Sequence, residues 1–162
     1  MLNPLNKLIT IVAFLLITFS SQSIAQKAPD FTLNGDNGKV KLSAYKNKVV
    51  YVDFWASWCK PCAKSFPFMN DMQARYGKKG FEIIAINLDS EHSAAKGFLK
   101  KHPAKFTIAY DPDGKTPALY QLKVMPTSYL IDRKGNLVNV HKGFKEKQKS
   151  KLEKLIVQTL NK

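Results

Sequence analysis

Cysteine is scarce in this chain: only two of its 162 residues are cysteines. Both lie in the segment 58–62, which reads Trp-Cys-Lys-Pro-Cys, and no second CxxC motif follows. The three histidines, His92, His102 and His141, are scattered without the spacing of metal ligands. A closed structural zinc site needs four ligands. The sequence therefore argues against such a site, and we expect neither a bound metal nor another cofactor.

A membrane-spanning helix needs roughly 20 apolar residues, and no apolar run in this sequence is that long. The apolar stretch at residues 8–19 follows a single positive charge at Lys7 and precedes a segment of small residues that ends before Gln26. This pattern is typical of a secretory signal peptide. We expect residues 1–25 to be that signal peptide and residues 26–162 to form one domain. The domain would be periplasmic or otherwise exported and soluble after cleavage, with an uncleaved N-terminal anchor as the alternative.

Acidic residues are few: 12 Asp and Glu stand against 26 Lys and Arg, for a formal net charge of +14. Nucleic acid is a common partner of such basic chains. An exported chain rarely meets nucleic acid, and these lysines are not interleaved with aromatic residues on one element, so we expect no nucleic-acid partner. The lysine run at 145–151 is interpreted as the solvated face of a C-terminal helix. An acidic partner or an anionic membrane surface is compatible with this charge.

Hydrophobic periodicity predicts strands and helices that alternate along the chain. Residues 49–55 form a near-continuous apolar run, which is typical of a strand buried on both faces. Ser90 is expected to cap a helix that ends before Pro103. The expected strands are 39–42, 49–55, 81–88, 106–110, 127–131 and 137–141, and the expected helices are 61–76, 90–102, 117–121 and 145–160. This order predicts an α/β domain whose central mixed sheet is covered by helices on both faces.

The cysteine pair lies just after the strand at 49–55, where the next helix begins. Ligand chemistry in such sheets collects at the carboxyl ends of strands. The helix dipole and the free N–H groups of a first helical turn stabilise a thiolate. We therefore expect Cys59 and Cys62 to be a reversible dithiol/disulfide, with a pair of ordinary buried thiols as the alternative. A lone disulfide stays closed in an oxidising compartment, so a catalytic pair there needs a partner that resets it.

At these residues the chain resembles the thioredoxin superfamily, and within it the exported thiol:disulfide oxidoreductases akin to TlpA and ResA. The segment 52–62 matches the active-site strand and loop of that family, and the segment 124–127 matches its cis-proline loop. The opening at 28–33 and the insertion between Asp89 and Tyr110 resemble the exported subgroup. The resemblance implies an α/β thioredoxin fold: a central mixed β-sheet flanked by helices, with an N-terminal extension and a central αβ insertion.

The resemblance also implies a task for each matched residue of the CxxC segment. Cys59 is the attacking thiolate, and Cys62, deeper in the helix, resolves the mixed disulfide. Lys60 and Pro61 set the geometry and the potential of the ring, and proline is tolerated in the first helical turn. Trp58 shields the sulfurs and offers an apolar platform to the client chain.

Residues outside the CxxC segment complete the implied site. Asp53 matches a buried carboxylate that helps to move the proton of the resolving thiol, for which burial must raise its pKa. Pro126 is expected to form a cis bond with Met125, whose backbone is left free to pair with an extended client peptide. Thr127 stands where thioredoxins of cytochrome c maturation often carry glutamate. Glu91 lies roughly where ResA-like reductases place an acidic residue.

The leading hypothesis is an exported reductase of client protein disulfides, for example in cytochrome c maturation or copper-site assembly. Its partners would be client proteins with cysteine pairs and a membrane dithiol electron donor, and the expected state is a monomer. One alternative is a thiol peroxidase, which usually has a threonine three residues before its reactive cysteine, where this chain has Ala56. The other is a copper-binding chaperone that uses Cys59, Cys62 and His141 as soft ligands.

Overall fold

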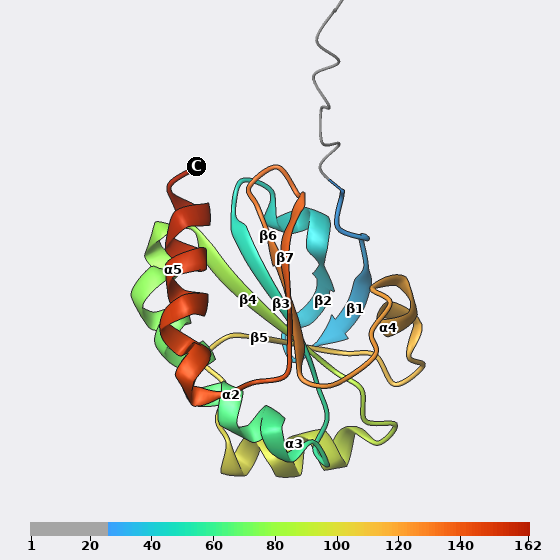
Figure 1. The fold of residues 1–162 in the computed structure, drawn as a ribbon. Helices are drawn as coiled ribbons and strands as arrows, with labels where there is room; N and C mark the ends of the chain where they lie inside the picture. Colours follow the sequence, from blue (N-terminus) through green and yellow to red (C-terminus); the bar gives the residue numbers. More distant parts are fainter. Residues whose placement is uncertain (1–25) are drawn as a thin grey trace, which may run out of the picture.

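The computed structural model describes residues 26–162, and the expected signal peptide lies outside the described residues. Strands and helices alternate along the chain, as Figure 1 shows. The strands are β1 (Thr32–Gly35), β2 (Gly38–Lys41), β3 (Val49–Trp55), β4 (Phe81–Asn87), β5 (Thr107–Tyr110), β6 (Thr127–Ile131) and β7 (Leu137–Lys142). The α-helices are α2 (Lys60–Tyr76), α3 (His92–Lys101), α4 (Lys115–Leu119) and α5 (Lys149–Leu160), and the short 3-10 helices are η2 (Leu42–Tyr45), η3 (Gly77–Lys79) and η4 (Glu146–Gln148).

The strands of this part of the chain form one mixed sheet in the order β2-β1-β5-β4-β3-β6-β7. The central strands β3, β4 and β5 run parallel, and the remaining neighbours pair antiparallel. β3 lies between β4 and β6, and all seven of its residues are buried. The apolar run at 49–55 thus forms the buried strand that its composition predicts, with the same bounds.

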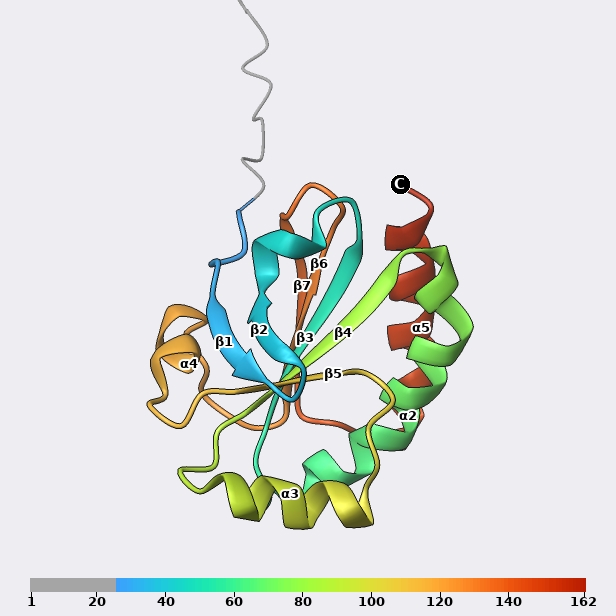
Figure 2. The same cartoon turned by 180° about the vertical axis from the view of Figure 1, so that it is seen from behind.

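Helices cover both faces of the sheet. On one face, α2, α3 and α5 pack over β3 and β4, and their buried side chains include Phe66, Phe98 and Ile156. On the other face, α4 leads into Tyr120, which packs with Phe54 and Tyr129. Figure 2 shows α4 and α5 on opposite sides of the sheet. The fold is the expected α/β thioredoxin fold with a central mixed sheet.

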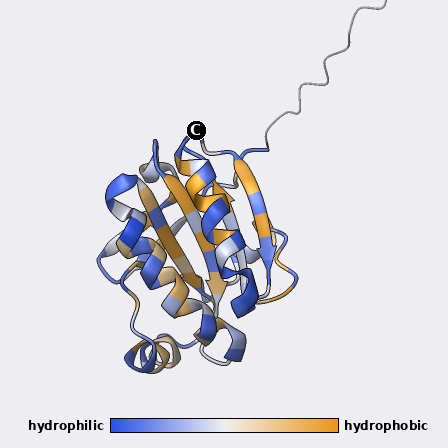
Figure 3. Ribbon diagram, turned by 60° about the vertical axis from the view of Figure 1, so that its left-hand side comes forward, coloured by the Kyte–Doolittle hydropathy of each residue, from blue (hydrophilic) through white to orange (hydrophobic). Residues whose placement is uncertain are grey.

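The distribution of hydropathy follows these layers. In Figure 3 hydrophobic residues dominate the central strands, and hydrophilic residues lie mainly on the helices and loops around them. Within residues 26–162 no helix is both long and apolar enough to cross a membrane.

Three local expectations need correction. Strand β1 was not among the strands that periodicity predicts, because it is only four residues long and ends in glycine. Helix α3 begins at His92, and its N-cap residue is Glu91 without a side-chain hydrogen bond, so Ser90 does not cap it. Helix α4 begins at Lys115, two residues before the expected start, because the carboxylate of Asp111 accepts the N–H groups of Lys115 and Thr116 at 3.3 and 2.6 Å.

Candidate active site

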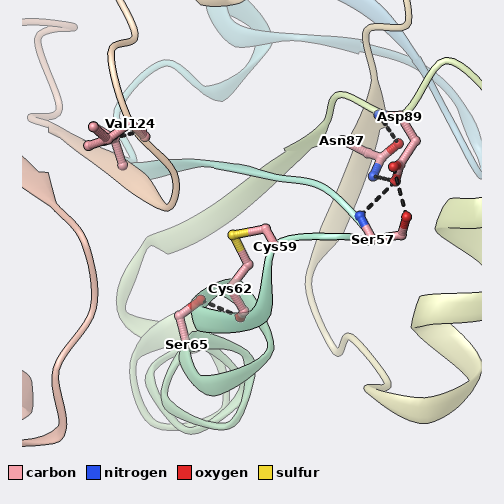
Figure 4. Close-up of a disulfide and its surroundings, with 8 residues drawn as sticks. Ser57, Cys59, Cys62, Ser65, Asn87, Asp89 and Val124 are labelled. Atoms are coloured by element: carbon pink, nitrogen blue, oxygen red, sulfur yellow. Dashed lines mark hydrogen bonds between the residues drawn. A yellow bond between two sulfur atoms is a disulfide. The ribbon is translucent and has the colours of Figure 1, made fainter.

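The two cysteines form a disulfide at the start of α2 (Figure 4). Their Cα atoms are 5.3 Å apart, within the usual range for a disulfide. Cys62 is completely buried, whereas 5 % of Cys59 is exposed. Of the two residues, Cys59 is therefore the less completely buried.

Backbone geometry explains why the pair lies at this junction. β3 ends at Trp55, and the N–H of Cys59 donates to the carbonyl of Ala56 at 3.1 Å, which closes a tight turn. Cys59 is the N-cap of α2, and its carbonyl accepts the N–H of Cys62 at 3.0 Å. Pro61 occupies the first turn, where helices tolerate proline because the N–H groups lack intrahelical partners. Lys60 and Pro61 are both exposed beside the disulfide.

A hydrogen-bonded cluster fixes the loop before the cysteines to the end of β4. The carboxylate of Asp89 accepts the backbone N–H of Ser57 at 2.9 Å and the Ser57 hydroxyl at 2.8 Å. It also accepts the side-chain amide of Asn87 at 2.7 Å, and this cluster lies beside the disulfide in Figure 4. Sequence reasoning missed Ser57, Asn87 and Asp89 as a unit. The available indication was that Asn87 ends a buried strand and Asp89 follows two residues later, while the neighbouring strand leads into the CxxC loop.

Asp53 is a charged residue in the middle of a buried strand. It lies on β3 between Tyr51 and Trp55, and alternation along the strand places it on the face that α2 covers. Only 2 % of Asp53 is exposed, and its Oδ2 atom has no hydrogen-bond partner among the described residues. Burial raises the pKa of the Asp53 carboxyl well above its usual value. The direction is the one that a proton carrier inside the core requires.

The loop before β6 contributes the other elements of the site. The peptide bond between Met125 and Pro126 is cis, as the sequence predicts. The half-buried Met125 packs against the core cluster that includes both cysteines. Among the hydrogen bonds of residues 26–162, none uses the backbone N–H or C=O of Met125. The loop therefore offers a free backbone segment next to the disulfide.

Two large apolar side chains are exposed around the pair. Trp58, directly before Cys59, is 69 % exposed, and Val124, directly before Met125, is 50 % exposed. The Val124 carbonyl accepts the hydroxyl of Thr127 at 2.7 Å, which holds this loop. Exposed apolar residues that flank a reactive group are typical of a surface that binds another chain.

Two other residues considered from the sequence lie at the start of α3 and on β7. Glu91 is exposed at the beginning of α3. His141 lies on β7, where burial and then the charge of Lys151 lower its pKa. Within residues 26–162 no three His, Cys, Asp or Glu side chains are grouped so that they could hold a metal ion. The combination of Cys59, Cys62 and His141 that a copper site would use is thus not assembled.

Comparison with known proteins gives consistent results. The Redoxin family model matches residues 24–156. ResA, a thiol-disulfide oxidoreductase of Bacillus thuringiensis subsp. konkukian, is 39 % identical over 134 residues, which cover 82 % of this chain and 76 % of that protein. ResA of Bacillus subtilis is 36 % identical over 124 residues, with 76 % and 69 % of the two chains covered. A crystal structure from Chlorobium tepidum, assigned as the thiol:disulfide interchange protein DsbE, superposes with a TM-score of 0.83 at 54 % identity and covers 84 % of this chain and 96 % of its own.

Proposed function

The chain belongs to the Redoxin family and is a ResA-like thiol:disulfide oxidoreductase of the thioredoxin fold, and from this premise we propose that it reduces disulfides of client proteins. The observation that carries the proposal is the disulfide at the start of α2, in which Cys62 is completely buried and Cys59 retains 5 % exposure. This difference in exposure supports an attacking role for Cys59 and a resolving role for Cys62.

The reaction has two thiol–disulfide exchange steps. The Cys59 thiolate attacks one sulfur of a client disulfide, and the other client sulfur leaves as a thiolate that takes up a proton. Cys62 then loses its proton and attacks the Cys59 sulfur, which releases the second client thiolate and re-forms the Cys59–Cys62 disulfide. Two electrons pass from the protein to the client, so an external dithiol must reduce the pair before the next turnover.

Local charge favours the first step. Cys59 is the N-cap of a 17-residue helix, where the positive end of the helix dipole and free N–H groups stabilise a thiolate. Lys60 adds a positive charge at the next residue. Both effects favour the thiolate form of Cys59 once the disulfide is reduced.

Asp53 supports the second step. Burial raises the pKa of the Asp53 carboxyl well above that of an ordinary aspartate, which makes its carboxylate a stronger base toward a neighbouring thiol. Asp53 lies under α2 on the same sheet face as Cys62, and we assign it the proton that Cys62 must lose before attack.

Client binding is assigned to the exposed apolar residues and to the free backbone around the pair. Trp58 and Val124 provide apolar contact, and the unpaired backbone of Met125 pairs with an extended client segment beside Cys59. Pro126 holds this loop, and Lys60 and Pro61 set the potential of the disulfide.

The wider role rests on the sequence and on the relatives. Residues 1–25 act as a signal peptide in this proposal, and residues 26–162 act outside the cytoplasm as a monomer. The relatives named ResA and DsbE support a thiol:disulfide oxidoreductase, and the signal-peptide pattern of residues 1–25 supports export. Its clients would be cysteine pairs such as those of apocytochromes c or of copper-site proteins. A membrane dithiol donor would supply the electrons, since the compartment is oxidising.

The experiment that tests the proposal compares two cysteine variants with the wild-type protein in reduction of insulin by dithiothreitol. Cys59→Ser should abolish catalysis, because no attacking sulfur remains. Cys62→Ala should also fail to turn over, but it should accumulate mixed disulfides with client proteins that dithiothreitol releases. Full insulin reduction by the Cys59→Ser variant, or equal trapping by both variants, would overturn the assignment.

A further inference from the structure

A groove runs along one side of Cys59, between the first turn of α2 and helix α3. Its volume is about 460 Å³. The α2 side of the groove consists of Ser57, Cys59, Lys60 and Ala63, and the α3 side consists of Ala94, Gly97, Phe98, Lys101 and His102. This surface is separate from Trp58 and Val124, to which the apolar client contact was assigned.

Phe98 fixes the α3 side of the groove to the core, and Gly97 leaves space within the groove. Phe98 packs against Trp55 and Phe66 with ring centroids 4.8 and 5.1 Å apart, which fixes α3 to the core. Gly97 lies inside α3, where glycine disfavours a helix, and a Cβ atom added there would meet nothing within 4 Å. The packing of the fold therefore does not require glycine at 97. Its effect is to leave space in the groove beside Cys59.

The charge of the groove has one sign. Lys60 and Lys101 line it, no acidic residue does, and neither lysine takes part in an ion pair among residues 26–162. Lys101, the last residue of α3, lies where the helix dipole favours a cation. Lys60, the first residue of α2, lies where the dipole disfavours one. Lys60 thus carries a positive charge that the helix dipole disfavours, directly after Cys59 in the sequence and in the same groove.

We propose that this groove binds the client segment next to the client's reactive cysteine, and that Lys60 and Lys101 select clients with aspartate or glutamate in that segment. The selection rests on the proposed reductase activity. An acidic side chain there meets two unpaired lysines, whereas a basic side chain meets repulsion from both. The groove also keeps the client chain in place while its sulfur exchanges with Cys59, so charge acts on the rate of the first step.

The test uses short peptides that each contain one internal disulfide flanked by glutamate, serine or lysine, in otherwise identical sequences. The reduced wild-type protein is mixed with each peptide at low ionic strength, and the rate of oxidation is followed by tryptophan fluorescence. Two favourable contacts of partly exposed charges should make the glutamate peptide react about tenfold faster than the lysine peptide. The ratio should shrink toward one at about 1 M salt, where the screening length is about 3 Å.

Two matched variants distinguish the effect of the groove lysines on client preference from the effect of the protein's overall charge. Lys101→Glu should abolish or invert the preference, whereas Lys154→Glu, the same change at an exposed position of α5, should keep it. Equal rates of the wild-type protein with the three peptides would overturn the proposed role of the groove while leaving the reductase intact. Equal glutamate-to-lysine rate ratios in the two variants would do the same. Failure to reduce any of the peptides would overturn the reductase and the groove together.

Discussion

The buried carboxyl of Asp53 gives the protein a pH dependence that a neutral replacement should remove. In the folded protein the pKa of Asp53 is raised by burial, whereas in the unfolded chain it is near 3.9. Between these two values the folded state holds a proton that the unfolded state has released. Asp53 therefore stabilises the fold less and less as the pH rises through this window, by about 1.4 kcal/mol per pH unit.

The perturbation is Asp53→Asn in the disulfide form, and the assay is urea unfolding at a series of pH values from about 4 to 8. Other titrating groups, such as His141, are common to both proteins and cancel in the difference of unfolding free energies. The unfolding free energy of the variant should rise relative to that of the wild type as the pH rises. The expected slope is about 1.4 kcal/mol per pH unit up to the pKa of Asp53 in the folded protein.

A surface substitution of the same kind provides the control for this experiment. Asp113→Asn removes an exposed carboxylate that pairs with an exposed Lys115, so its effect should stay within about 0.5 kcal/mol without that slope. Parallel pH profiles for the wild type and Asp53→Asn would show that Asp53 is ionised in the fold, and the proton-transfer role would be refuted with it.

Three further substitutions have defined outcomes. Asp89→Ala leaves the N–H of Ser57 and other buried donors unpaired, so the unfolding free energy should fall by about 2 kcal/mol; no change would mean that the cluster does not hold the loop. Gly97→Ala removes a helix-disfavouring residue where a methyl group fits, so thermal unfolding should show a gain of about 0.5–1 kcal/mol; a loss would contradict the open space above Gly97. Trp58→Ala should hardly change stability, since the side chain is 69 % exposed, but should raise the KM for insulin about fivefold through lost apolar contact; an unchanged KM would remove Trp58 from the binding surface.

Elements with a strong apolar pattern could be predicted from the sequence with accurate bounds. β3 and β6 match their expected ranges, because every position of both strands is buried and both runs are nearly all apolar or β-branched. Helix α5 begins at Lys149 rather than at residue 145, because a 3-10 turn at 146–148 precedes it and the lysine-rich run does not distinguish the two. Strand β1 is paired on both sides, and this pairing rather than its own composition makes it a strand.

The candidate site likewise has parts that could be predicted from the sequence and parts that could not. The CxxC segment and the cis-proline loop could be located because each is a contiguous motif. The Ser57–Asp89 hydrogen bonds span 32 residues, and the groove joins α2 to α3, so both depend on how distant segments meet. The position of Asp53 could be identified from the sequence, but the upward shift of its pKa depends on its burial under the helices that pack over β3.

The measurement that tests the central claim most directly is the equilibrium reduction potential of the Cys59–Cys62 pair. The protein would be equilibrated in dithiol buffers of known potential, and the fluorescence of Trp58 would report the reduced fraction. A protein that delivers electrons to client disulfides should have a value near that of thioredoxin, about −270 mV. A value near −120 mV would identify an oxidant instead and would contradict the proposed reductase.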